Sequence, residues 1–283
     1  MESAEIRPTE HRDRPGYAAL EVGVVFGEST VMSVFATSPL KLLTPRARGP
    51  SAWIYASSFG GGLVAGDQTQ LDLRIGSGAR CVVGTQAFTK VYRNPGRLPC
   101  GHVTHATLEA DSLLVFAPEP VQAFAGSTYT QHQEFHLAPG AGLVLLDWFC
   151  SGRVARGERW EFAHFQSRND VFVDGERVFV DSILLDPNDG ALASPHRGGR
   201  FNCFAVLLLL GPAVQDAARR LVEEMASRPV EPGSSLVCSA SPVRDGVMLR
   251  LAGEELEEVG RELHRHLIPL STLLGDDPWQ RKW

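Results

Sequence analysis

Two aspartates occupy positions where a carboxylate could bind a metal ion. Asp67 closes the glycine-rich turn 60–66, and Asp147 follows the apolar run 143–146. Strand alternation places Asp147 among buried neighbours, and a buried carboxylate is costly unless it is hydrogen-bonded, paired or metal-bound. Asp67 has a simpler interpretation as part of a tight turn between strands. Both are candidates for oxygen ligands of a metal ion.

Two further acids have less distinctive surroundings. Asp181 alternates with apolar side chains in a strand-like run, and Glu158 closes a segment that contains Arg153 and Arg156. Either Asp147 or Glu158 could therefore form a structural ion pair with one of these arginines. The sequence leaves both the structural and the functional interpretation open.

A second constellation contains histidine. His132, Glu134 and His136 fall at every second position of the predicted strand 128–137, so they share one face. Two imidazoles and a carboxylate suit nickel, zinc or copper. The alternative, which the pattern favours, is a solvated polar face of that strand.

Signatures of common catalytic nucleophiles are missing. The sequence has no Gly-x-Ser-x-Gly elbow and no His-Glu-x-x-His, and its five cysteines form no Cys-x-x-Cys pair. Several acids on an all-β scaffold could still make a carboxylate-dependent glycosidase. That is the enzyme alternative to a protein without catalytic activity.

The elements that must position these residues are mostly short strands. From residue 16 to 201, strand-like runs recur about every 8 to 12 residues between Gly, Pro and Asp, including runs at 159–167 and 170–173. That spacing is typical of a sandwich, a barrel or a solenoid. We find no fixed-length repeat that would indicate a propeller.

The character changes after residue 201. Region 202–268 begins with the apolar run 202–210, typical of a strand buried on both faces, and it contains two amphipathic helical patterns. We predict a small α+β layer there. Residues 1–15 are expected to form a mobile polar leader and 269–283 an irregular tail.

Composition narrows the class of partner. The 27 basic and 33 acidic residues give a formal net charge of -6, which argues against nucleic acid and against an anionic membrane surface. The longest apolar run is too short to span a bilayer, and the charged N-terminal stretch lacks the apolar core of a signal peptide. Widely spaced cysteines fit a reduced cytoplasmic protein.

Four segments in a fixed order resemble one known family. They are GGGLVAGD at 60–67, GTQAFTKVYR at 84–93, FAPEP at 116–120 and LDWFCSGRVARGERW at 146–160. Together they resemble the urease accessory protein UreD, called UreH in some bacteria. The resemblance runs from about residue 16 to 283, and it implies a β-helix-like body.

The resemblance also implies a function. UreD-like proteins are non-enzymatic maturation factors that bind apo-urease on one side and UreF on the other, with the GTPase UreG bound to UreF. Nickel would cross a water-filled passage in transit, with no tightly bound cofactor. We expect Asp67, Asp147, Asp181 and Glu158 to line that passage. A clamp that holds apo-urease without carrying metal is the alternative.

Other residues would support the passage or the partners. The expected wall or charge-compensating residues are Thr85, Gln86, Lys90, Tyr92, Arg93, Arg153 and Arg156. Arg281 and Trp283 match an Arg-x-Trp ending typical of the family, and we expect them to bind a partner. Gln280 stands where the family usually has proline.

Overall fold

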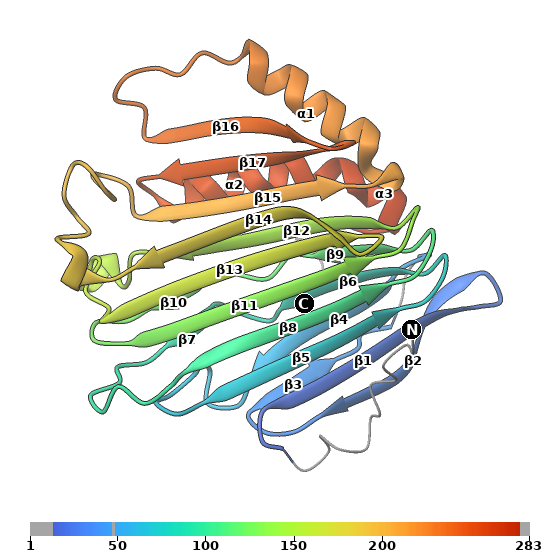
Figure 1. The fold of residues 1–283 in the computed structure, drawn as a ribbon, viewed down its shortest axis with the longest axis horizontal. Helices are drawn as coiled ribbons and strands as arrows, with labels where there is room; N and C mark the ends of the chain where they lie inside the picture. Colours follow the sequence, from blue (N-terminus) through green and yellow to red (C-terminus); the bar gives the residue numbers. More distant parts are fainter. Residues whose placement is uncertain (1–13, 47–48, 278–283) are drawn as a thin grey trace.

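A computed structural model describes residues 14–46 and 49–277 of the chain (Figure 1). It confirms the predicted fold class: a β-solenoid-like body, with helices packed near its C-terminal end. Two large sheets, here called sheet A and sheet B, face each other across the body. The chain passes repeatedly from one sheet to the other.

Sheet A carries most of the candidate acids and histidines. Its strands are β1 (Tyr17–Val25), β2 (Glu28–Ala36), β5 (Gln68–Ile75), β8 (Gly101–Leu108), β11 (Thr128–Leu137), β13 (His164–Val173) and β14 (Glu176–Leu185). They lie in the order β14-β13-β11-β8-β5-β1-β2. The five strands from β13 to β1 are parallel, whereas β2 and β14 are antiparallel edge strands.

Sheet B faces sheet A and extends beyond it. Its strands are β3 (Leu40–Leu43), β4 (Ala52–Ser58), β6 (Arg80–Thr85), β7 (Thr89–Val91), β9 (Leu113–Phe116), β10 (Val121–Ala123), β12 (Gly142–Cys150), β15 (Cys203–Leu210), β16 (Leu236–Val243) and β17 (Gly246–Gly253). The path runs β16-β17-β15-β12-β9-β6-β4-β3, and the short β7 and β10 pair beside β12. Strands β4, β6, β9 and β12 are parallel because each coil returns one strand further along.

Helices cover the outer face of sheet B. The helical elements are α1 (Gln215–Ser227), α2 (Leu256–Leu267), α3 (Ser271–Leu274) and the 3-10 turns η1 (Val154–Arg156), η2 (Pro187–Asp189), η3 (Pro212–Val214) and η4 (Ile268–Leu270). Leu221 and Leu263 from the two longer helices pack with Leu207 and Leu209 of β15. Helices therefore bury one face of β15 and the solenoid interior the other, as its apolar run predicts. No helix in the described ranges has the length and apolarity needed to cross a bilayer.

Two segments differ from the sequence expectation. The predicted runs 159–167 and 170–173 are wrong as separate strands, because the observed strand is the single β13. Residues before it turn inward instead: Trp160 has a positive φ of 58°, and it packs with Phe162 in an aromatic cluster. The expected irregular tail begins as η4 and α3, whose Leu270 and Leu274 are buried against the helical layer.

The inner face of sheet A changes character along its strands. Toward the carboxyl ends, apolar side chains such as Leu73, Phe135 and Val171 form the core with sheet B. Nearer the amino ends, one row is polar across β5, β8, β11 and β13, and the next is polar across β8, β11 and β13. We call these residues the polar layer: Thr69, His102, Gln131 and Ser167 in one row, and Thr104, Gln133 and Asn169 in the next.

Candidate functional site

Asp147 of β12 reaches across the interior to the polar layer. The Ser167 hydroxyl donates to Asp147 Oδ2 at 2.6 Å, and Asn169 Nδ2 donates to the same oxygen at 2.8 Å. Gln131 Nε2 donates to Asp147 Oδ1 at 3.1 Å. Three side chains from two strands of sheet A, β11 and β13, thus hold a carboxylate of sheet B.

Strand alternation explains why Asp147 faces inward. On β12, Leu143 and Leu145 belong to the interior core, whereas Leu146 and Trp148 pack under the helices. Asp147 has the parity of the first pair, so it points at sheet A. The structural alternative from the sequence, an ion pair of Asp147 with an arginine, is not what its hydrogen-bond partners show.

Burial dominates the electrostatics of Asp147. It raises the pKa of this carboxyl group above its usual value, the three hydrogen bonds offset part of that rise, and the nearby Asp181 adds to it. All three donors are neutral, so they stabilise the carboxylate without cancelling its charge. A negative charge on Asp147 would therefore have no neutralising partner among these three donors.

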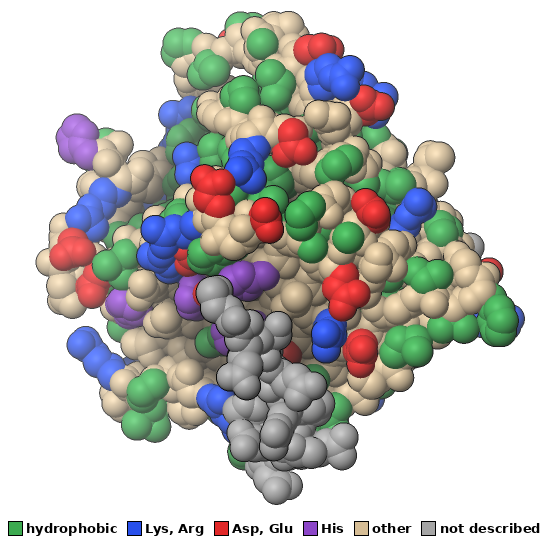
Figure 2. All heavy atoms as spheres, turned by 45° about the vertical axis from the view of Figure 1, so that its right-hand side comes forward, with side chains coloured by type: hydrophobic (Ala, Val, Ile, Leu, Met, Phe, Trp, Pro, Cys, Tyr) green, Lys and Arg blue, Asp and Glu red, His purple; other side chains and the backbone are tan. Residues whose placement is uncertain are grey.

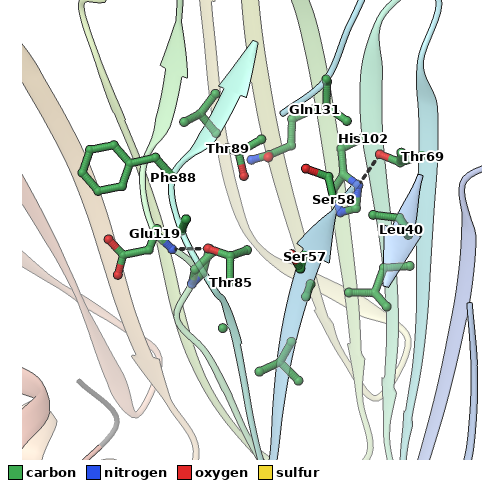
Figure 3. A pocket seen from close by; sticks show the side chains of 18 of the residues that line it. Leu40, Ser57, Ser58, Thr69, Thr85, Phe88, Thr89, His102, Glu119 and Gln131 are labelled. Atoms are coloured by element: carbon green, nitrogen blue, oxygen red, sulfur yellow. Dashed lines mark hydrogen bonds between the residues drawn. The ribbon is translucent and has the colours of Figure 1, made fainter. Parts of the chain in front are cut away.

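A first cavity of about 120 Å³ lies between the sheets on one side of Asp147. Figure 3 shows Thr85, Phe88 and Glu119 on one side of this cavity, and His102 beside Thr69 on the other. The backbone N–H of Glu119 donates to the Thr85 hydroxyl at 2.8 Å. Carboxylate, hydroxyl and amide groups thus share a largely apolar chamber.

His102 is an interior residue that was not among the predicted passage residues. Its Nδ1 lies 2.8 Å from the Thr69 hydroxyl, and its Nε2 lies 3.0 Å from the Thr104 hydroxyl. Burial lowers the pKa of His102 to about 4, so the ring is neutral at physiological pH. A neutral ring puts no positive charge in the way of a cation. The signal available was strand parity, which places His102 and Gln131 inward.

A second cavity of about 380 Å³ begins on the other side of Asp147. Asp147 lines both cavities. The second one opens between β14 and the C-terminal strands, where Asp181 forms an ion pair with Arg250 at 2.7 Å. Asp147 and Asp181 therefore both line the second cavity, and their role in a passage stays a prediction.

Asp67 and Glu158 lie outside the linings of both cavities. Asp67 Oδ2 accepts from the Val64 backbone N–H at 2.8 Å, which closes the glycine turn. Glu158 Oε2 accepts from Arg153 Nε at 2.8 Å and pairs with the same guanidinium through its other oxygen. These contacts correspond to the structural interpretations, a turn and an ion pair. Their passage role stays a prediction.

The expected wall residues divide in the same way. Thr85 lines the first cavity, but Gln86, Lys90, Tyr92, Arg93, Arg153 and Arg156 do not line either cavity. Tyr92 packs edge-on against Phe124 at a centroid distance of 5.3 Å, and Arg153 lies 4.1 Å above the same ring. Arg281 and Trp283 fall outside the described residues.

His132, Glu134 and His136 share the outer face of sheet A, as predicted, but they do not converge. His136 Nε2 lies 2.5 Å from Glu134 Oε1, whereas His132 Nε2 lies 3.1 Å from Asp170 Oδ2. Strand geometry separates the two histidines by about 13 Å along β11. One ion cannot draw all three together without distorting the strand.

Comparison with known proteins identifies the family. The model of the family described as "UreD urease accessory protein" matches residues 14–283. A urease accessory protein UreD of Sorangium cellulosum is 46% identical over 261 residues, covering 92% of this chain and 81% of that protein. A UreD of Anaeromyxobacter is 40% identical over 95% of this chain and 90% of its own. Urease accessory protein D of Oryza sativa is 32% identical over 99% of both.

This chain belongs to the UreD family. Its relatives are named as urease accessory proteins and not as enzymes. All four segments that carried the resemblance to UreD meet at the first cavity. They contribute, in chain order, Leu63, Thr85, Glu119 and Asp147 to its lining. Gly62 permits the approach of the first two segments, because a Cβ there would come within 2.5 Å of the Lys90 carbonyl oxygen.

Proposed function

We propose that this UreD protein bridges apo-urease and the accessory proteins UreF and UreG, and that it conducts nickel through its two cavities. The observation that carries the proposal is the position of Asp147, which forms part of the wall of both cavities. An ion that moves from one to the other passes this carboxylate. The named relatives support the coarser role in urease maturation.

The chemistry of the lining favours transit over storage. A conducting site must attract an ion without trapping it. Asp147 and Asp181 offer oxygen ligands, and the nitrogens of His102 are occupied by two threonine hydroxyls. Nickel binds more firmly to cages of histidine and cysteine than to scattered oxygens. In the second cavity, the ion pair between Arg250 and Asp181 must break before Asp181 can bind the ion.

The direct test replaces Asp147 by asparagine. We expect Asp147→Asn to lower urease activation and the nickel content of urease on the order of tenfold, the scale on which support of a metal site is lost. Asp170→Asn is the matched control, because Asp170 follows Asn169 on β13 but faces outward, where it pairs with Arg168. That control should activate urease normally.

Copurification separates the possible outcomes. Under the proposal, Asp147→Asn still copurifies with UreF, UreG and urease while nickel delivery falls. Normal activation by Asp147→Asn would refute the passage and leave the metal-independent clamp. Failure of the wild-type chain to copurify with these partners would refute the bridge. The glycosidase alternative gains no support from the named relatives.

A further inference from the structure

A row of charged side chains crosses the outer face of sheet A, away from both cavities. The register places Asp72, His105, Glu134 and Asp170 side by side on β5, β8, β11 and β13. Figure 2 shows several histidine side chains close together on this face. Among the described residues no helix packs over the row, unlike the outer face of sheet B (Figure 1). Within the row the His105 side chain is 46% exposed, whereas Asp170 is buried.

Asp72 holds His105 in a defined orientation. His105 Nδ1 lies 3.3 Å from Asp72 Oδ1, and Asp72 is fixed in turn by donors from Tyr17 at 2.8 Å and Gln70 at 2.9 Å. This arrangement leaves His105 Nε2 without a hydrogen-bond partner among the described residues. A carboxylate on one ring nitrogen and an available second nitrogen is the usual arrangement of a metal-binding histidine.

Glu134 lies between His105 and a second histidine. It is paired in register with His105, and adjacent strands lie about 4.8 Å apart. His136 is two residues further along β11, on the same face, and its Nε2 already contacts Glu134 Oε1 at 2.5 Å. The His136 ring also stacks on Phe172 at a centroid distance of 4.7 Å, which limits where it can go.

We propose that His105, Glu134 and His136 form a binding site for one divalent transition-metal ion of the nickel, copper and zinc class. A site with two imidazole nitrogens and one carboxylate binds these borderline ions in preference to magnesium or calcium. To bind, the His105 ring must bring its Nε2 toward Glu134, which His136 Nε2 already contacts. The side chains of His105 and His136 are each 46% exposed, so this movement requires no repacking of the core.

The site differs from the set suggested by the sequence. Alternation along one strand grouped His132 with Glu134 and His136, but His132 is turned toward Asp170, which also pairs with Arg168. His105 replaces it, from a strand about 30 residues away in the chain. The proposal does not depend on the nickel passage, since the passage lies on the other face of sheet A.

A second cluster has donor atoms suited to a metal ion, but arginine side chains already neutralise its charge. Glu224, Glu262 and His266 place three donor atoms within 4.8 Å of one another, and they are the one such group among the described residues. Arg228 contacts Glu262 at 2.5 Å, and Arg265 contacts the same carboxylate at 2.7 Å. A cation would have to displace both guanidinium groups, so this cluster is better explained as an interhelical ion-pair network.

Equilibrium dialysis of the full chain against Ni²⁺ alone tests the proposal. We expect His105→Ala, Glu134→Gln and His136→Ala each to weaken binding of one ion about tenfold or more. His132→Ala is the matched control, because it removes an exposed histidine from the same face and strand. It should leave that ion in place.

Two results would overturn the site. If His105→Ala bound nickel as tightly as the wild type, His105 would not be a ligand. An equal loss in His132→Ala would point to the three residues of β11 instead. Because these side chains are exposed, the variants should keep the thermal stability of the wild type, which a melting curve checks. Glu134→Gln preserves shape and remains informative even if an alanine variant is unstable.

Discussion

Two neighbouring positions of β11 lie in different kinds of interior. The side chain of Phe135 is fully buried, and it packs edge-on against Phe116 at a centroid distance of 5.6 Å. Gln133 is 2% exposed, and its Nε2 donates to Asn169 Oδ1 at 2.7 Å. The same strand thus supplies both the apolar core and the polar layer, within two residues.

The apolar core and the polar layer contribute differently to the protein. Apolar contacts stabilise the fold with little dependence on exact partner chemistry. Buried amides and hydroxyls add little net stability when paired, yet they are expensive to leave unpaired. The polar layer is therefore a poor way to stabilise a protein, and a good way to hold the carboxylate of Asp147 inside one.

The largest effect on stability should come from the apolar side. Phe135→Ala removes a fully buried ring from the core between the sheets. We expect the free energy of unfolding to fall by about 3–5 kcal/mol, because transfer and cavity terms add. Urea denaturation measures it. A loss below about 1 kcal/mol would mean that the core collapses around the gap.

The matched change on the polar side should cost less. Gln133→Leu keeps similar bulk but leaves Asn169 Oδ1 without its donor. We expect a loss of about 1–3 kcal/mol, the penalty for an unsatisfied buried acceptor. The same denaturation assay compares it with Phe135→Ala. If Gln133→Leu were the more harmful, the polar layer would be the main source of stability, contrary to this account.

The smallest effect should depend on pH. The pKa of Asp147 is raised in the folded state, so its stabilising contribution is present below the ordinary aspartate pKa and is lost as pH rises through the folded value. Asp147→Asn has no such group. Relative to wild type, its free energy of unfolding should rise from about pH 4 upward, by at most about 1.4 kcal/mol per pH unit.

Denaturation at several pH values between 4 and 8 gives this difference. A constant offset between wild type and Asp147→Asn would show that the pKa of Asp147 is not shifted. Asp170 supplies the opposite sign, because hydrogen bonding from Arg168 lowers the pKa of that carboxyl group. Asp170→Asn should therefore be less stable than the wild type above the ordinary aspartate pKa. This difference in the free energy of unfolding should shrink as pH falls below that pKa.

Several features could be predicted from local pattern. Alternation located strands such as 128–137 with its observed bounds, and parity placed His132 and His136 on one outward face. The continuous apolar run predicted that β15 is buried. The prediction of a strand at 159–167 was wrong because Trp160 and Phe162 are apolar for a different reason: they pack in an aromatic cluster with Phe165 and do not pair in a sheet.

The sequence by itself determined which side chains face the same way along each strand, because that depends only on a two-residue period. It also carried the family motifs. The tertiary structure alone decided which strands are neighbours and in what register. That register brought Gln131, Ser167 and Asn169 to Asp147, and it set His105 beside Glu134. Parallel coils are joined by long connections, so such contacts leave no trace in local spacing.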